Sequence, residues 1–381
     1  MARNPARVVI CRSNPVAPDP RVEKHVRALL EAGYQVTVIG WDRSASLPEG
    51  EKRDGYKVHR IRIAASYGTG MGNLFKLAAW QARLFLWLFR HRREFDLVHA
   101  CDFDTVLPGM ALKSISGKKL IYDIFDFYPD HLRHTPLWLK NLIRSLDYYM
   151  INRADAVILV DDSRREQIKG TSPRLLTVIY NTPERSQAPK MDPCTSAEGS
   201  LHLAYVGLFQ RERGLLEVLS VLERNPEWVL DLAGFGGDLD EIRAAASGLP
   251  NVHWHGIVPY DKALKLSSRA DALFATYDPS VPNHRYSSPN KLFEAMMLAK
   301  PIVVAKDTNM DQIVLQNECG IVVTYGDMRE LENAFRQLAD NPARRKILGE
   351  NARKAYETLY NWNIMKTRLV SLYSKTLQTN G

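Results

Sequence analysis

The sequence predicts two Rossmann-like, doubly wound α/β domains that face each other across a cleft. Short β-branched runs alternate with helical or loop segments over most of the chain, which is typical of parallel strands joined by crossover helices. Several runs, such as DAVILVD at 155–161, are almost continuously apolar, as expected of strands covered on both faces. A polar, proline-containing stretch separates two such series, so we expect two domains.

The predicted domains are residues 1–180 and 201–358, joined by a linker at 181–200. The linker contains Pro183, Pro189 and Pro193 and should resist regular structure. Residues 359–381 are expected to form a C-terminal helix that packs back on the first domain. The expected strands are 7–13, 35–41, 56–63, 95–101, 119–125, 155–161 and 175–181 in the first domain, and 201–207, 228–236, 251–258, 270–277, 301–305 and 319–325 in the second.

Composition excludes several classes of protein. With 45% hydrophobic residues and a net charge of +8, the 381-residue chain has enough apolar surface to fold. Its longest apolar run, Leu84–Phe89, is far shorter than the roughly 18 residues that span a bilayer. The N-terminus lacks a secretory signal pattern, and the four cysteines show no metal or redox spacing. We therefore expect a cytoplasmic protein.

The segment SSPNKLFEAMMLAKPIVVA, residues 287–305, contains the most informative pattern. Pro289 stands where a helix should begin, and Lys291 lies in its first turn. Free N–H groups at a helix N-terminus beside a lysine form an anion site, particularly for phosphate. Glu294, about one turn later, is placed to accept two hydrogen bonds from a vicinal diol such as a ribose. The alternative is a solvated ion pair between Lys291 and Glu294.

This segment resembles the nucleotide-sugar-binding signature of retaining GT-B glycosyltransferases similar to glycosyltransferase family 4. Further matches follow in order over about 350 residues, and their order is more specific than any one of them. They are DPRVEKHVRALLEAGYQVTVIGWDR at 19–43, the YD-containing strand end at 122–126, VIYNTPE at 178–184, AYVGLFQRERG at 204–214, LAGFG at 232–236 and YNW at 360–362.

The resemblance implies roles for residues of the second domain. Glu294 would hold the ribose of a UDP- or GDP-sugar donor, while Lys291 and the Asn290 backbone would meet its diphosphate. Fixed cations there stabilise the charge that builds on the leaving phosphate, so no metal or other cofactor is expected. The remaining implied donor-site residues are the basic Arg213, Arg211 as a substitute for an arginine missing at Leu208, Ser288 at the helix start, and Gly234 and Gly236 where backbone approaches the nucleotide.

The sequence departs from the family at two further positions. Family members often carry a glutamate where this chain has Tyr286, and a histidine that contacts the donor sugar where it has Phe125. Asp126, at the end of a predicted strand, is our candidate for a catalytic or acceptor-binding carboxylate; a loop-capping role is the alternative. Asp102 and Asp104 resemble the metal-binding Asp-x-Asp of the GT-A fold, but that fold would leave the second domain unexplained.

Two basic, aromatic segments of the first domain suggest a membrane-facing surface. Residues 73–93 contain five basic side chains and no acidic one, and helical spacing puts Trp80, Arg83, Trp87 and Arg90 on one stripe. Residues 131–153 repeat the combination. The stripe is predicted to contact an anionic membrane surface; the alternative is a crossover helix packed on the sheet. No nucleic-acid-binding motif accompanies the charge, so no nucleic acid partner is expected.

The sequence thus predicts a retaining glycosyltransferase of the hexosyl or N-acetylhexosaminyl type. It would use a lipid-linked or polysaccharide acceptor while peripherally associated with the cytosolic membrane face. Two alternatives remain open: a nucleotide-sugar epimerase on the same fold, which would need no acceptor, and a non-catalytic nucleotide-sugar-binding subunit. A dehydrogenase is disfavoured because no GxGxxG motif follows the first strand.

Overall fold

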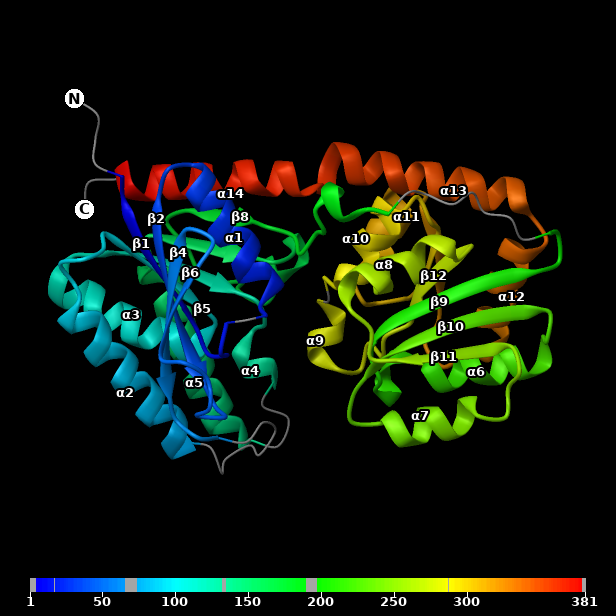
Figure 1. The fold of residues 1–381 in the computed structure, drawn as a ribbon, viewed down its shortest axis with the longest axis horizontal. Coiled ribbons are helices and arrows are strands. Elements are labelled where there is room, and N and C mark those ends of the chain that lie inside the picture. Colours follow the sequence, from blue (N-terminus) through cyan, green and yellow to red (C-terminus); the bar gives the residue numbers. More distant parts are fainter. Residues whose placement is uncertain are drawn as a thin grey trace. The chain divides into compact units, whose positions relative to one another are not determined.

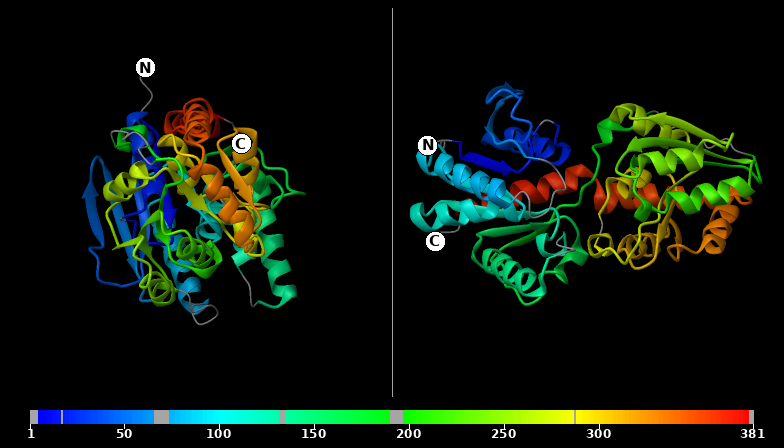
Figure 2. Two further views of the ribbon diagram at one scale, coloured as in Figure 1. Left: turned by 90° about the vertical axis from the view of Figure 1, so that its right-hand side faces the viewer. Right: turned by 90° about the horizontal axis from the view of Figure 1, so that it is seen from below.

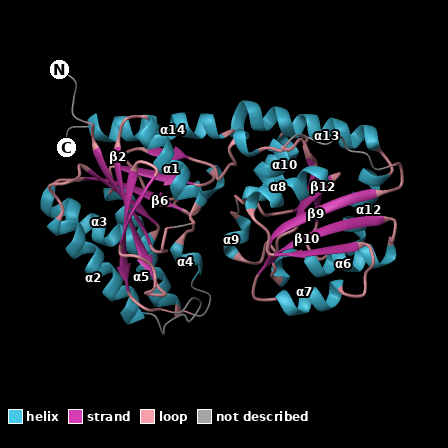
Figure 3. Cartoon of the chain, in the orientation of Figure 1, coloured by secondary structure: helices cyan, strands magenta, loops and turns pink. Residues whose placement is uncertain are grey.

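The computed structural model describes residues 5–16, 18–65, 74–131, 135–189, 197–286 and 288–378. Contacts between residues divide the chain into two compact units (Figure 1). Unit 1 comprises Met1–Ile179 and Met365–Gly381, and unit 2 comprises Tyr180–Ile364. Each unit is built around one sheet with helices on both faces (Figure 3). The described parts of segment 181–200 contain only one 3₁₀ turn, Arg185–Gln187, and belong to unit 2.

Unit 1 contains an eight-stranded sheet within the described residues, in the order β3-β4-β2-β1-β5-β6-β7-β8. Its strands pair in parallel except for β3 and β4, which form an antiparallel hairpin at the edge. The strands are β1 (Arg7–Arg12), β2 (Gln35–Asp42), β3 (Gly50–Arg53), β4 (Tyr56–Arg62), β5 (Leu97–Cys101), β6 (Lys119–Ile124), β7 (Ala156–Leu159) and β8 (Leu176–Val178). The hairpin strand β3 was not predicted from the sequence.

Helices cover both faces of this sheet, as the two further views in Figure 2 show. On β5, His99 contacts Tyr373 of α14 (Trp362–Gln378), on the face where α1 (Pro20–Glu31) also packs. The neighbouring Val98 points to the opposite face and lies beside Gly109 of α3 (Phe103–Ser116). That face also carries α2 (Leu74–Arg90) and α5 (Leu137–Arg153), and the short α4 (Tyr128–His131) follows β6.

The structure corrects the expected orientation of α2. Trp80 is fully buried and stacks on Trp41 of β2, with ring centroids 5.4 Å apart. Trp87 is half-buried between the rings of His59 and His91. The prediction that Trp80 contacts a membrane is therefore wrong, because this side of the helix fills the space above the sheet. The apolar residues that α2 does expose are Leu74, Phe75 and Leu86, and Arg83 and Arg90 are exposed as well.

Unit 2 contains a fully parallel sheet, six-stranded within the described residues, in the order β11-β10-β9-β12-β13-β14. This is the doubly wound arrangement, in which the strand order reverses next to the first strand. The strands are β9 (Leu201–Leu208), β10 (Trp228–Phe235), β11 (Val252–Gly256), β12 (Ala272–Ala275), β13 (Ile302–Ala305) and β14 (Gly320–Val323). All six coincide with runs predicted as strands.

The helices of unit 2 bury one apolar cluster on each side of the sheet. The first cluster joins the sheet to α6 (Leu215–Arg224), α7 (Leu239–Ala246) and α12 (Met328–Ala339). The second joins it to α8 (Tyr260–Arg269), α10 (Asn290–Met297), α11 (Met310–Gln316) and α13 (Pro342–Ala355). The short α9 (Pro282–Arg285) precedes α10.

A buried carboxylate, Asp123 at the end of β6, gathers polar side chains in unit 1. Arg21 of α1 donates to both Asp123 oxygens at 3.1 and 3.4 Å and to the Ile179 carbonyl at 2.9 Å. His99 lies 3.3 Å from Asp123 and 2.5 Å from the Tyr373 hydroxyl. Burial by itself would raise the pKa of Asp123, but Arg21 and His99 outweigh burial and hold it well below its usual range. This network joins α1, β5, β6 and α14.

Asp123→Asn should strongly destabilise unit 1. The substitution removes the negative charge and leaves the buried Arg21 guanidinium without its ionic partner, at an expected cost of about 3–5 kcal/mol in the free energy of unfolding. Urea denaturation followed by circular dichroism measures the change. Asp162→Asn, which breaks an exposed ion pair with Arg165, is the control and should shift stability by less than about 0.5 kcal/mol. Equal stability of the two variants would contradict this account.

Candidate functional site

The candidate site of unit 2 lies where the strand order of its sheet reverses, between β9 and β12. In open parallel sheets, the chain leaves these two strands in opposite directions and opens a crevice at their carboxyl ends. β9 ends at Leu208 and β12 ends at Ala275, next to Thr276 and Tyr277. The structure brings Lys291 and Arg213, both predicted site residues, to this point.

Lys291 is a buried cation at the carboxyl end of β9. It lies in the first turn of α10, is 7% exposed, and donates from Nζ to the Val206 carbonyl at 2.5 Å. Nζ also sits 3.8 Å from the centroid of the Tyr205 ring. Burial and, to a smaller extent, the nearby Arg213 charge lower the pKa of Lys291 to about 7. A bound anion would offset that cost and favour the protonated amine.

Arg213 lies on the other side of the crevice, in the 3₁₀ turn Arg211–Arg213 after β9. Its guanidinium covers the Tyr277 ring at 3.9 Å, and its carbonyl accepts a hydrogen bond from the Thr276 hydroxyl at 3.3 Å. Its Nε is buried and has no hydrogen-bond partner among the described residues. Arg213 therefore retains hydrogen-bonding capacity for a ligand.

Glu294 lies one turn beyond Lys291 on α10 and accepts a hydrogen bond from the Tyr260 hydroxyl at 2.9 Å. Burial, followed by the Glu294 charge, raises the pKa of Tyr260, so this phenol remains a donor. At the start of the helix Asn290 is exposed, whereas the Ser288 hydroxyl is buried without a hydrogen-bond partner among the described residues. The N-terminus of α10 thus combines backbone N–H groups, a lysine and a hydroxyl.

Two glycines at the end of β10, Gly234 within the strand and Gly236 just after it, allow the backbone to approach closely. A Cβ on Gly234 would lie 1.9 Å from the Gly207 carbonyl oxygen, and one on Gly236 would lie 2.3 Å from the Phe209 carbonyl oxygen. Any larger residue would push these turns apart. The Phe209 amide donates to the Phe235 carbonyl at 2.6 Å, which locks the two strand ends together.

Arg211 is exposed and paired with an acidic residue of α7. Its Nε donates to Glu241 at 2.5 Å, and its amide donates to Asp238 at 2.9 Å. At the position of the absent family glutamate, Tyr286 follows α9. His284 of α9 was not singled out from the sequence. It is buried beside Tyr277, its Nδ1 lies 3.0 Å from the Asp278 carbonyl, and burial together with the Arg213 charge lowers its pKa to about 4.

In unit 1, charged side chains meet where β1 and β5 end, at the corresponding reversal of strand order. Arg12 forms an ion pair with Asp102, which also accepts hydrogen bonds from the amides of Phe125 at 2.8 Å and Asp126 at 3.3 Å. The Arg12 guanidinium covers the Phe125 ring at 4.1 Å. Burial raises the pKa of Asp102 to about 6 despite Arg12. Asp102 therefore positions the loop that carries Asp126.

Asp126 itself is half-exposed. Its carboxylate accepts a hydrogen bond from Arg164 at 2.9 Å, and Arg164 is almost completely buried. The arrangement fixes one carboxylate oxygen of Asp126 on Arg164.

Among the described residues, His25, His99 and Asp123 are the one group of potential metal ligands whose ligand atoms already lie within 4.8 Å of one another. All three side chains are fully buried, and Arg21 already occupies both oxygens of Asp123. A divalent cation here would leave buried positive charge uncompensated. The donor set therefore suits the hydrogen-bonded network described above and does not suit a metal.

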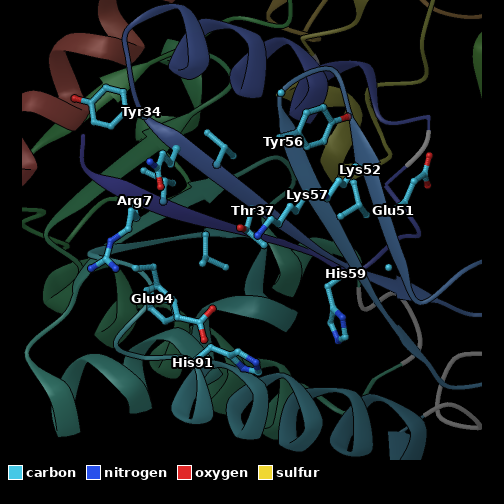
Figure 4. A pocket seen from close by; sticks show the side chains of 18 of the residues that line it. Arg7, Tyr34, Thr37, Glu51, Lys52, Tyr56, Lys57, His59, His91 and Glu94 are labelled. Carbon is cyan, nitrogen blue, oxygen red and sulfur yellow. The ribbon is translucent and has the colours of Figure 1, made fainter. Parts of the chain in front are cut away.

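A groove of about 960 Å³ lies elsewhere in unit 1, near the amino ends of its strands (Figure 4). Arg7 and Gln35, the first residues of β1 and β2, line it together with His59 and His91. Figure 4 shows Arg7, Thr37, Lys57 and His59 on the strands, with His91 and Glu94 below them. Its cationic and acidic side chains are mixed, and it lies away from the carboxyl ends where Asp102 and Asp126 meet.

Comparison with known proteins identifies the class that this fold and site define. Residues 17–182 match the family model described as glycosyl transferase 4-like domain, and residues 190–355 match glycosyl transferases group 1. The chain belongs to this family of glycosyltransferases, and its fold is GT-B, with two Rossmann-like domains.

The relatives agree with this assignment. The uncharacterized glycosyltransferase MJ1069 of Methanocaldococcus jannaschii is 21% identical over 81% of this chain and 80% of its own length. The O-antigen chain mannosyltransferase C of Escherichia coli is 26% identical over 48% of this chain and 49% of its own length. The structure of HepE from Anabaena in complex with UDP-glucose superposes with a TM-score of 0.72 at 16% identity, over 97% of this chain and 99% of HepE. In the described part of the chain, no helix is both long and apolar enough to cross a membrane.

Gly234→Ala should destabilise unit 2, since the added methyl group would lie 1.9 Å from the Gly207 oxygen and both are fixed in strand ends. We expect a loss of about 1–3 kcal/mol in the free energy of unfolding, measured by urea denaturation. Gly237→Ala is the matched control, because no atom lies within 4 Å of its added Cβ. If both substitutions are tolerated equally, the close approach of the two turns is not a constraint.

Proposed function

We propose that this glycosyltransferase moves a hexosyl or N-acetylhexosaminyl group from a UDP- or GDP-sugar to a lipid-linked or polysaccharide acceptor, with retention of anomeric configuration, at the cytosolic face of a membrane. The UDP-glucose bound to HepE and the O-antigen chain named for the Escherichia coli relative support the classes of donor and acceptor. No metal is required in this proposal, since protein cations face the diphosphate.

The convergence of Lys291, Arg213 and the start of α10 is the observation that carries the proposal. Two buried polar atoms there, Arg213 Nε and Ser288 Oγ, have no protein partner among the described residues. The amine of Lys291 is held by a carbonyl and an aromatic ring. A diphosphate would supply acceptor oxygens to all three groups and to the N–H groups of α10.

In the proposed reaction, the acceptor hydroxyl attacks the anomeric carbon from the face that the diphosphate leaves. The bond between the anomeric carbon and the phosphate oxygen breaks, the new glycosidic bond forms, and the acceptor proton passes to the leaving phosphate. Negative charge grows on that phosphate, where Arg213 and Lys291 are the stabilising cations. Glu294 holds the ribose of the donor, and the turn containing Gly234 and Gly236 lets backbone approach the nucleotide. For Arg211 to contact the diphosphate of the donor, its ion pair with Glu241 would have to break.

Unit 1 would supply the acceptor side. Asp126 is a carboxylate held on one oxygen by Arg164, and its loop is fixed by Asp102. It is placed at the carboxyl end of β6, where such sheets bind ligands. We assign Asp126 to an acceptor hydroxyl or to the transferred sugar. Phe125, which replaces the family's histidine, is instead a platform for Arg12 and Arg21.

Membrane contact, in this proposal, involves the exposed apolar residues of α5 and α2. On α5, Trp138, Leu142, Leu146 and Tyr149 form an exposed stripe, and Trp138 is 69% exposed. The first turn of α2 exposes Phe75 to 87%. The first turns of both helices lie at the same end of unit 1 in Figure 1. Arg83, Arg90 and Arg153 are exposed further along the same two helices and add positive charge, which together with apolar anchors favours peripheral membrane binding.

Glu294→Ala should weaken donor binding. Loss of two charge-assisted hydrogen bonds to a ribose corresponds to about a 10- to 100-fold rise in the Kd of the nucleotide sugar, measured by isothermal titration calorimetry. Glu332→Ala on α12, which removes an ion pair with Arg336, is the control and should leave the Kd unchanged. An unaltered Kd in the Glu294 variant would refute the donor site.

A Trp138→Ser, Leu142→Ser double variant should bind membranes less well. Each side chain loses apolar burial of about 1.5–3 kcal/mol if it inserts, so co-sedimentation with vesicles containing phosphatidylglycerol should fall at least about tenfold. Ile347→Ser, which removes an equally exposed apolar residue from α13 in unit 2, should have no effect. Undiminished vesicle binding by the double variant would exclude the α5 stripe as the membrane contact.

A further inference from the structure

Three histidines surround one aspartate on the sheet of unit 2. Asp231 lies in β10, and its Oδ2 is 2.8 Å from Nε2 of His202 in β9. Its Oδ1 is 2.6 Å from Nε2 of His255 and 3.5 Å from Nδ1 of His253, both in the edge strand β11. Three histidines from the two strands that flank β10 therefore converge on a single carboxylate.

The register of the strands produces this arrangement. Asp231 is paired directly with His253 across the parallel ladder, and His255 follows two residues later, so both imidazoles project from the same face as the carboxylate. Leu230, Leu232 and Trp254 alternate with them and belong to the apolar cluster beneath α6 and α7. Since α6 and α7 pack on the face of the sheet that carries Leu230 and Leu232, the histidines and Asp231 lie on the opposite face.

The charges and exposure of these residues differ from those of an ordinary ion pair. Among the described residues, the ion-pair partners of Asp231 are imidazoles, with no lysine or arginine among them. Burial acts to raise the pKa of Asp231, but hydrogen bonds from His202 and His255 outweigh it and lower the pKa to about 2. His202 and His255 are about a quarter exposed and His253 is 56% exposed, so solutes can reach the cluster.

Three imidazole nitrogens and a carboxylate oxygen are the ligands that Zn²⁺ and similar borderline transition metals prefer. The buried trio of His25, His99 and Asp123 offers fewer donors and already contains the Arg21 cation, whereas this cluster offers four donor residues and has no fixed cation within its described contacts. Each imidazole is held at one carboxylate oxygen, and the ligand atoms do not yet all lie within 4.8 Å of one another. Rotation of the exposed His253 ring and of the partly buried His255 ring would bring their nitrogens to a common ion at Oδ1.

We propose that His253, His255 and Asp231 form a binding site for one Zn²⁺-class transition metal ion on the outer strands of unit 2, with His202 as a fourth ligand or as the residue that orients Asp231. The site is separate from the donor-binding residues: no group in it belongs to the proposed catalytic machinery. Binding there would fasten the edge strand β11 to β10 and stabilise unit 2 by linkage.

The test uses the full-length protein freed of metal by chelation. Titration with ZnSO₄ in a non-coordinating buffer should show one saturable site per chain by calorimetry, and Zn²⁺ should raise the unfolding temperature, whereas a large excess of Mg²⁺ should do neither. His253→Ala combined with His255→Ala should weaken Zn²⁺ binding at least about 100-fold, and His202→Ala by about 10-fold. The milder His255→Gln variant covers the case in which the double variant folds poorly.

The matched control is His59→Ala combined with His91→Ala, because the rings of these two histidines stack on Trp87 in unit 1 and neither residue belongs to the Asp231 cluster. This control should retain the wild-type affinity for Zn²⁺. Three results would overturn the proposal: no saturable binding below about 100 μM Zn²⁺, a stoichiometry unaffected by the β11 variants, or equal loss of binding in the control.

Discussion

The reversal of strand order between β9 and β12 is the constraint on which the candidate donor site depends. The chain leaves the two strands in opposite directions, which opens a crevice at their carboxyl ends. The side chains of the segments that follow the two strands line this crevice. Here they carry Arg213 after β9 and Tyr277 after β12, and α10 brings Lys291 back to the Val206 carbonyl. Residues that are 64 (Arg213 and Tyr277) and 85 (Val206 and Lys291) positions apart in the chain thus become neighbours.

The central strands of unit 2 were predictable because both faces of the sheet are covered there. Burial on both sides produces the continuous apolar runs that sequence reasoning recognises, as in Leu201–Leu208 and Ile302–Ala305. The edge strand β3, GEKR, has no apolar pattern, since it pairs on one side only. The sequence clue to this hairpin was the Asp54–Gly55 dipeptide before β4, because Asp-Gly commonly forms the two-residue loop of a β-hairpin.

Helix α2 shows where periodicity fails. Leu, Phe and Trp occur around most of its circumference, so spacing alone does not decide which side faces the sheet. The orientation of α2 is set by Trp41 on β2, a residue distant in sequence whose ring stacks on Trp80. In the site, the same limit applies to Tyr260 and His284: their relevance lies in contacts with Glu294 and Tyr277, and neither belongs to a motif. Lys291 and Glu294 were predictable because they share one short helix.

The proposed donor explains why so much positive charge is kept in a poorly solvated place. Burying Lys291 costs free energy, which appears as its lowered pKa, and Arg213 adds to that cost by repulsion. A protein that needed only a stable fold would replace the pair with apolar residues. In the proposed complex, the diphosphate removes the repulsion and restores the ordinary proton affinity of Lys291. The positive charges of Lys291 and Arg213, which destabilise the protein alone, then stabilise the complex. This stabilisation is greatest when the leaving phosphate becomes most negative.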